Sequence, residues 1–179
     1  MSGSFTSAQF REALSHFASG VTIITARSEA GPVGFTASAF SSVSLAPPLV
    51  LVCVAHTASA HDAVVAAERF GVNVLAERQG WLAEQFAKHG IDRFEGVALH
   101  EAGGASVPLL EGALVHLECR RHTLHTAGDH TILIGEVERS ATWPGRPLVH
   151  YTRKLGAFVA QGAPRGAASA EEAPKNGEG

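Results

Sequence analysis

The sequence predicts a mainly β fold, an antiparallel barrel that is closed or partly closed and has helices at its ends. Segments rich in apolar and β-branched residues recur along the chain, and only two or three amphipathic helical segments interrupt them. A length of 179 residues, with 45% apolar and 17% charged residues, allows one domain with a sizeable core. The chain shows no internal repeat, so a solenoid is excluded.

The first expected element is an amphipathic helix over residues 5–20. Thr6 can cap its N-terminus with Gln9 returning the hydrogen bond, Phe5 can pack on Phe10, and Gly20 supplies the stop. Apolar residues at helical spacing form one face, made of Phe10, Ala13, Leu14, Phe17 and Ala18. We expect this face to lie on the barrel.

A hairpin and an interior strand are expected next. Residues 21–25 favour a strand because β-branched side chains dominate them, and Gly31-Pro32 predicts a turn into a second strand at 33–35. Pro47-Pro48 then breaks the chain before residues 49–54. That run is too apolar for a strand with one face in water, so both of its faces should be buried.

The remaining elements alternate helix and strand before a β-rich second half. We expect a helix over 59–68, a strand over 70–75, and a helix over 79–89 that turns Leu82 and Phe86 inward and ends at Gly90. Strands over 113–123 and 130–140 should form a hairpin across 126–129, followed by a short element at 148–159. Residues 161–179 lack large apolar side chains, which predicts a disordered tail behind a folded domain of residues 1–160.

Composition narrows the class of ligand and the compartment. The net charge is −3 and the basic residues form no stripe, which disfavours nucleic acid and anionic membranes and favours a small ligand. No signal peptide or spanning segment is apparent, so we expect a cytoplasmic protein. Cys53 and Cys119 lie in apolar segments, where free thiols are expected.

Several other chemistries are disfavoured by spacing. His116, His122, His125 and His130 surround one predicted hairpin near Cys119, but they form no recognised zinc pattern, so we predict no metal site. The chain has no G-x-S-x-G elbow for a nucleophilic serine. It also has no G-x-G-x-x-G turn, so a Rossmann domain for the nicotinamide is not expected.

The stretch at residues 34–45, GFTASAFSSVSL, is dense in small hydroxylated residues where a core strand would be apolar. Hydroxyls and approachable backbone N–H groups suit the edge of a flat heterocycle and a phosphate. A solvent-facing strand with Ser and Thr turns accounts for the same residues equally well. Spacing alone leaves both interpretations open.

The longer run GFTASAFSSVSLAPPLV at residues 34–50 resembles the signature of flavin reductases that serve two-component flavin monooxygenases. The likeness continues in order through GVTIIT, FGVNVLAERQ, DRFEG, GDHT and PLVHY, so that it covers about residues 5–158. The resemblance implies an FMN-binding split β-barrel with Greek-key-like antiparallel strands, and a homodimer. It implies hydride transfer from NADH or NADPH to FMN or FAD, with reduced flavin passing to a separate monooxygenase. The alternative is a non-catalytic flavin-binding protein or a relative of pyridoxamine-phosphate oxidases.

The resemblance also assigns cofactor-binding residues. It places Thr36, Ala37 and Ser38 at the isoalloxazine edge, and Ser41 and Ser42 near the phosphate and ribityl chain. Further cofactor contacts are implied after the apolar strand and in the DRF loop, at Cys53, His56, Ser59, Lys88, Arg93 and Phe94. For Lys88, a solvated charge near a helix C-terminus remains the alternative.

The nicotinamide side of the site is implied by the GDHT and PLVHY motifs. His130 would be the catalytic residue, positioning the carboxamide or helping to protonate the reduced flavin. A strand-end histidine that bonds a backbone carbonyl is the alternative. Tyr151 and Arg153 would border the same pocket. The chain departs from the family after them, because an aromatic residue is common where this sequence reads Arg153-Lys154-Leu155-Gly156.

Overall fold

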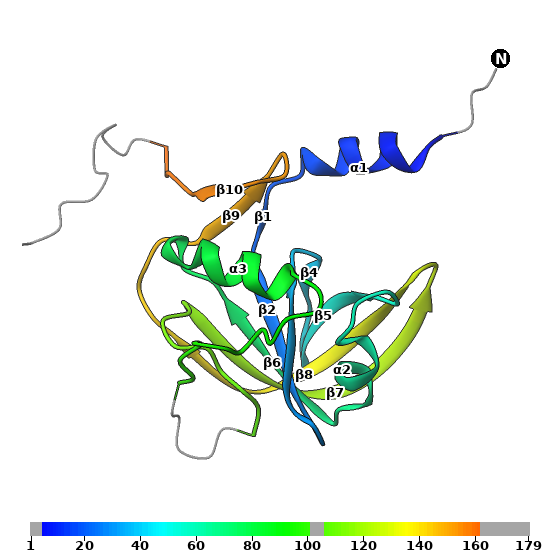
Figure 1. Cartoon of the computed structure of the whole chain (residues 1–179), viewed down its shortest axis with the longest axis vertical. Coiled ribbons are helices and arrows are strands. Elements are labelled where there is room, and N and C mark those ends of the chain that lie inside the picture. The colour runs from blue at the N-terminus through cyan, green and yellow to red at the C-terminus, as the bar shows by residue number, and fades with distance from the viewer. Residues whose placement is uncertain (1–4, 101–105, 162–179) are drawn as a thin grey trace, which may run out of the picture.

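The computed structural model describes residues 5–100 and 106–161 and consists mainly of antiparallel strands (Figure 1). The larger sheet has the order β3-β2-β6-β7-β8-β5-β4, and a small sheet has the order β1-β9-β10. The two outermost strands of the larger sheet, β3 and β4, are consecutive in the chain, and the Cys53 amide of β5 donates to the Ala39 carbonyl between them. The sheet therefore curls into the barrel that the sequence predicts.

The larger sheet contains β2 (Thr22–Ser28), β3 (Gly31–Ala37), β4 (Phe40–Leu45), β5 (Pro48–Ala55), β6 (Arg69–Val74), β7 (Val115–Ala127) and β8 (His130–Thr142). The small sheet contains β1 (Ser19–Gly20), β9 (Leu148–Tyr151) and β10 (Lys154–Ala157). The helices are α1 (Ser7–Ser15), α2 (His61–Ala66), the short 3-10 turn η1 (Glu77–Gln79) and α3 (Gly80–Ala87).

Both predicted hairpins are confirmed. β2 pairs with β3 from Thr22 opposite Ala37 to Ser28 opposite Gly31, and Gly31 has the positive φ of 122° that this turn needs. β7 and β8 pair along their length to the turn at Gly128, where φ is 61°. The expected single element at 148–159 is two strands instead, because Thr152 and Arg153 both adopt positive φ and reverse the chain.

The prediction that residues 49–54 have two buried faces is wrong in part. β5 does lie inside the sheet, between β8 and β4. Its burial alternates, however: Val50, Val52 and Val54 are buried in the core, whereas Leu51 and Cys53 are only partly buried. The second apolar face of β5 forms the floor of a cavity.

Helix α3 packs on the barrel as expected, with Leu82 and Phe86 buried. A Cβ at Gly34 of β3 would lie 3.0 Å from the Phe86 ring and 2.8 Å from the Ile24 carbonyl oxygen, so glycine is needed there for this close packing. Burial of a phenylalanine such as Phe86 contributes about 3 kcal/mol to the free energy of unfolding. The helix ends at Ala87, with Lys88 as its cap, before the predicted stop at Gly90.

Helix α1 confirms its predicted start but not its packing. Thr6 and Gln9 form the reciprocal capping box, and the Phe5 and Phe10 rings lie 6.2 Å apart, edge to face. The helix ends at Ser15 because His16, rather than Gly20, caps it. Its apolar side is exposed, with Leu14 52% exposed, since α1 extends past β9 and β10, away from the larger sheet (Figure 1).

Three further sequence predictions concern the two thiols, membrane-spanning helices and the C-terminal tail. Cys53 and Cys119 are both free thiols. Within residues 5–100 and 106–161, no helix has the length and hydropathy to cross a membrane. The predicted disordered tail, residues 161–179, lies outside the described residues except for Gln161.

Candidate functional site

A cavity of about 550 Å³ opens between α1, β4 and β5; we call it the β4–β5 cavity. Its volume is within the range of cofactor sites. Four of the residues that the sequence assigned to the cofactor line it: Ser38, Ser41, Cys53 and Arg153. Its other lining residues are Phe10, Arg11, Leu14, Ser15, Phe17, Ser19, Ala39, Phe40, Leu51 and His150. Hydroxyls and two guanidinium groups, those of Arg11 and Arg153, therefore line the cavity together with an apolar floor.

The alternation of β4 separates the two serines that the resemblance placed together. Ser41 lies opposite Leu51 of β5, and both line the cavity. Ser42 lies opposite the buried Val50 and does not line it, because neighbouring side chains of a strand point to opposite faces. The Ser41 hydroxyl donates to the Ser42 carbonyl oxygen at 3.1 Å. A cofactor contact of Ser42 is untested, and the orientation of its side chain leads us to expect none within this cavity.

Thr36 and Ala37 end β3 directly before Ser38, which lines the cavity. The Thr36 hydroxyl and the Ala37 carbonyl oxygen both already form hydrogen bonds within the fold. The Thr36 hydroxyl donates to the Ala83 carbonyl oxygen of α3 at 2.7 Å. The Ala37 carbonyl oxygen accepts from the Thr22 hydroxyl at 2.8 Å. These bonds fix the strand end against α3 and β2, and the predicted flavin contacts of Thr36 and Ala37 remain untested.

Arg93 and Phe94 line a smaller hollow of about 170 Å³ together with Ser59 and Gly34. Arg93 donates from Nε and Nη2 to the Lys88 carbonyl oxygen at 2.8 and 2.6 Å, and from Nη1 to the Gly34 carbonyl oxygen at 2.9 Å. Burial lowers the pKa of its guanidinium. Arg93 thus joins the DRF loop to α3 and β3.

The other two predicted residues of this loop region also have contacts within the fold. The Phe94 ring packs edge to face on Phe86 of α3, with centroids 4.9 Å apart. Lys88 caps α3, and its carbonyl oxygen receives the Arg93 bonds. Cofactor binding by Ser59, Lys88, Arg93 and Phe94 stays a prediction.

His130 stands at the β7–β8 turn, and its neighbours are tied to the segment after β5. Its Nδ1 lies 2.7 Å from Asp129 Oδ1, and this hydrogen bond is the main cause that lowers the pKa of Asp129. The His56 amide donates to the Asp129 carbonyl oxygen at 3.0 Å, and His61 Nε2 lies 2.9 Å from the Thr131 hydroxyl. His130 is therefore held by a carboxylate rather than by the backbone carbonyl of the alternative interpretation.

Tyr151 and Arg153 lie in the small sheet beside α1. Arg153 Nη2 bonds Glu12 Oε2 at 2.7 Å, which attaches α1 to the β9–β10 turn at the wall of the cavity. Tyr151 is 47% exposed and packs its ring edge on His16, with centroids 6.1 Å apart. Tyr151 is not part of the cavity lining in this chain.

Sequence reasoning missed Ser19 and His150, which both line the β4–β5 cavity. The pairing of β1 with β9 places them directly opposite each other. No local spacing signals this contact, because it depends on a pairing between the two ends of the chain. The PLVHY motif contains His150 and was the only signal available.

The comparisons with known proteins identify the family of this chain. Residues 14–158 match the model of the flavin reductase like domain family. The chain is 42% identical over 159 residues to the FMN reductase (NADH) SmoA of Agrobacterium fabrum, covering 89% of this chain and 90% of that protein. It is 41% identical over 152 residues to the reductase component of the 4-nitrophenol 4-monooxygenase/4-nitrocatechol 2-monooxygenase of Rhodococcus opacus, covering 85% and 81%.

A solved structure extends the likeness to three dimensions. The NADH:FAD oxidoreductase of Streptomyces globisporus C-1027, solved with NAD and FAD fragments, superposes with a TM-score of 0.81 at 38% identity. The match covers 87% of this chain and 94% of that one. The cavity of this chain has hydroxyl groups on its wall and apolar side chains on its floor, which suits a flat ring system with a polar edge. This chain belongs to the flavin reductase-like domain family, and its fold is the split β-barrel of that family.

Proposed function

We propose that this protein is an NAD(P)H-dependent flavin reductase that transfers hydride from a nicotinamide to FMN or FAD. The observation that carries the proposal is the β4–β5 cavity, in which the hydroxyls of Ser38 and Ser41 face the apolar side chain of Leu51. A flat ring system with a polar edge is complementary to such a wall and floor.

In the proposed reaction, the protein mainly binds the flavin and the nicotinamide and orients their rings. Ser38 and Ser41 hold the flavin, which supplies the hydride acceptor when bound, and Arg153 borders the nicotinamide side of the site. His130 binds the nicotinamide carboxamide through Nε2, because its Nδ1 is held by Asp129. Fixed orientation of two rings at reacting distance accounts for most of the rate enhancement expected in such a reaction.

The proposal includes a homodimer. The exposed apolar side of α1, which includes Phe10 and Leu14, and Phe17 just after the helix line a cavity that is open in the single chain. A second copy related by a two-fold axis would cover these side chains and close the cavity.

The proposal also includes a separate monooxygenase that receives the reduced flavin, because the Rhodococcus opacus relative is the reductase component of a monooxygenase. The location we propose is the cytoplasm, since reducing compartments suit the two free thiols.

Steady-state assays test this function directly. NADH and NADPH are each combined with FMN and FAD, and the loss of absorbance of the reduced nicotinamide is followed with and without the protein. We expect flavin-dependent consumption with at least one of these pairs. Consumption that never exceeds the rate without protein would overturn the proposal.

A further inference from the structure

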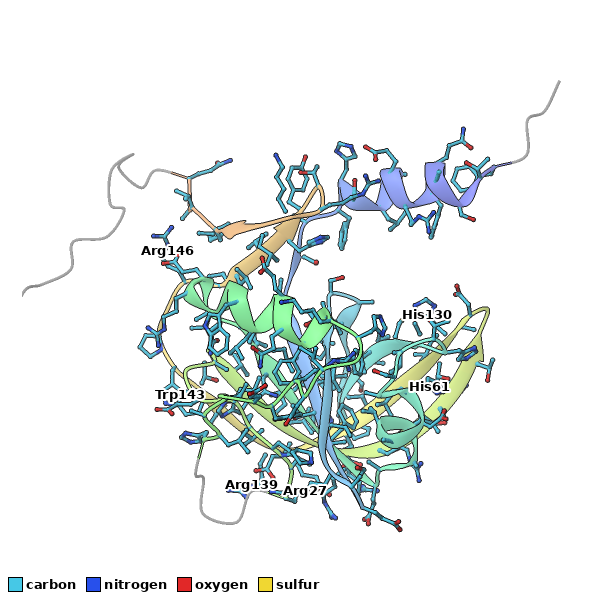
Figure 2. The ribbon with its side chains drawn as sticks, viewed as in Figure 1. Arg27, His61, His130, Arg139, Trp143 and Arg146 are labelled. Carbon is cyan, nitrogen blue, oxygen red and sulfur yellow. The ribbon has the colours of Figure 1, made fainter. Side chains whose placement is uncertain are left out.

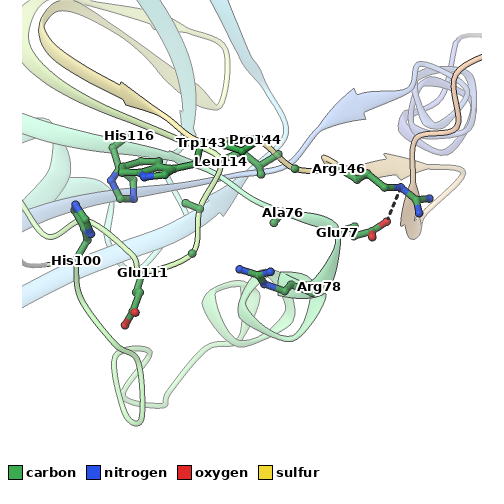
Figure 3. A pocket seen from close by; sticks show the side chains of 13 residues that line it. Ala76, Glu77, Arg78, His100, Glu111, Leu114, His116, Trp143, Pro144 and Arg146 are labelled. Carbon is green, nitrogen blue, oxygen red and sulfur yellow. Dashed lines mark ion pairs between the residues drawn. The ribbon is translucent and has the colours of Figure 1, made fainter. Parts of the chain in front are cut away.

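A second pocket, of about 570 Å³, lies on the other side of the barrel from His130 (Figures 2 and 3). We call it the Trp143 pocket. Its lining residues include Arg78, His100, Gly112, His116, Trp143 and Arg146. It shares no lining residue with the β4–β5 cavity, so the proposed reductase site does not account for it.

Hydrogen bonds between separate chain segments hold the walls of this pocket in place. The Glu77 amide donates to the Arg146 carbonyl oxygen, and the Trp143 amide donates to the Leu114 carbonyl oxygen, each at 2.8 Å. Gln79 Nε2 donates to the Glu111 carbonyl oxygen at 2.8 Å. Because three segments are fixed to one another, the backbone around the pocket is held in place before any ligand arrives.

Three aromatic rings form one wall of the Trp143 pocket (Figure 3). The Trp143 ring lies 4.8 Å from that of His116 and 5.3 Å from that of His100, both edge to face, and the two imidazoles are 5.2 Å apart. Trp143 is 37% exposed. A flat aromatic ligand has ring faces and edges here on which to pack.

His116 carries a hydrogen-bonding group that the described fold leaves unused. The side chain is buried, and desolvation lowers its pKa, so the ring is neutral near pH 7. Its Nε2 lies 2.8 Å from the Leu110 carbonyl oxygen, which places the proton on Nε2 and leaves Nδ1 as an acceptor. Among the described residues Nδ1 has no partner. Buried acceptors without partners are rare in folded proteins.

Arg78 supplies a positive charge at the opposite side of the pocket (Figure 3). Its guanidinium makes no hydrogen bond or ion pair with the described residues, whereas Arg146 is paired with Glu77 at 3.2 Å. Gly112, with a φ of 76°, leaves the space beside Arg78 open, since a Cβ there would lie 3.4 Å from Arg78 Nη2. An unpaired guanidinium favours a carboxylate ligand.

We propose that the Trp143 pocket binds a small planar aromatic acid that carries a ring hydroxyl. The carboxylate bonds Arg78, the ring packs on Trp143, and the hydroxyl donates to His116 Nδ1. The Nδ1 atom of His116 is closed off from solvent by the rings of Trp143 and His100 that pack on it. Trp143 is the more exposed of these two rings, so we expect the indole to shift when the ligand hydroxyl reaches Nδ1. Trp143 therefore reports on binding.

The test is fluorescence titration of the full chain carrying Trp81→Phe, in which Trp143 is the only remaining tryptophan. The probe is 4-hydroxybenzoate, with excitation at the red edge of the indole band, and calorimetry provides a second readout. We expect a saturable change that Arg78→Gln weakens about tenfold, the loss expected for a charge-assisted hydrogen bond. The matched control, Arg27→Gln on β2, should bind as tightly as the parent.

Two comparisons separate the groups of the ligand. Benzoate, which lacks the hydroxyl, should bind more weakly than 4-hydroxybenzoate, and His116→Phe should remove that difference. Neutral 4-hydroxybenzyl alcohol has no carboxylate for Arg78. It should therefore bind weakly to the parent, and Arg78→Gln should bind it with the same weak affinity. No saturable signal from 4-hydroxybenzoate at millimolar concentration, or equal affinity in Arg78→Gln and the parent, would overturn the proposal. Neither outcome depends on NAD(P)H oxidation, so the test is independent of the proposed reductase function.

Discussion

Arg93 shows how one residue can satisfy a family motif and also support the fold. Its three donated hydrogen bonds go to the carbonyl oxygens of Lys88 and Gly34. No sequence pattern indicates these bonds, since a guanidinium in a loop is equally suited to a phosphate and to carbonyl oxygens. Only the folded chain brings β3 and the end of α3 to Arg93.

We predict that Arg93→Ala lowers the free energy of unfolding by about 2 kcal/mol, because bonds from a charged group to carbonyl oxygens are lost together. Arg93→Lys should restore only part of this, since an ammonium lacks the planar fork. Urea denaturation measures both. Arg27→Ala is the control, because Arg27 is exposed near the end of β2, and it should change stability by less than about 0.5 kcal/mol. Equal stability of Arg93→Ala and the parent would contradict the structural role.

The two cysteines differ in burial, and this difference leads to a second prediction at the residue scale. Burial raises the pKa of the Cys119 thiol to about 12, so this thiol stays protonated and unreactive at pH 8. Cys53 lines the β4–β5 cavity and is only partly buried. Iodoacetamide should therefore modify Cys53 alone in the native protein and both residues in urea, as measured by peptide mass spectrometry.

Added FMN or FAD should slow the modification of Cys53, because the cofactor would cover the cavity. Cys119 provides the internal control, since its protection by burial does not depend on flavin. Modification of Cys53 at the same rate with and without saturating flavin would place the flavin elsewhere.

At the scale of elements, the sequence predicted well what depends on neighbouring residues. The α1 capping box and the two hairpins were correct because caps and turns are decided within a few residues. The contact of Ser19 with His150 was missed because strand pairing between distant segments has no local signal. The apolar side of α1 was assigned to the barrel, yet it is exposed, since periodicity shows that a face is apolar but not what covers it.

Helix α1 carries the prediction about assembly. Leu14→Glu places a charge on the apolar side of α1 and should convert the proposed dimer to a monomer, because burial of an unpaired carboxylate is costly. Light scattering measures the mass. Ala8→Glu is the matched control, since it lies about 160° around the helix from Phe10 and should leave the dimer intact. A parent chain that is monomeric with flavin present would contradict the dimer.

For the whole molecule, composition and strand spacing predicted a barrel without naming a ligand. The hydroxyl-rich segment is compatible with a polar binding site or a solvent-facing strand, and in the folded chain its successive serines lie on different faces of β4. Ser41 faces the cavity and Ser42 does not, a difference set by the register of β4 on β5. Motif resemblance assigned both serines to the cofactor because it carries no information about which face each side chain occupies.

This pair gives the most direct test of the central claim that flavin reduction takes place in the β4–β5 cavity. The measurement is the rate of NADH oxidation against flavin concentration for the parent, Ser41→Trp and Ser42→Trp, with circular dichroism to confirm that each variant is folded. We predict that Ser41→Trp fills the cavity and lowers kcat/KM for flavin at least about tenfold, equivalent to roughly 1.4 kcal/mol, whereas Ser42→Trp stays near the parent. Equal activity of folded Ser41→Trp and the parent would contradict the claim.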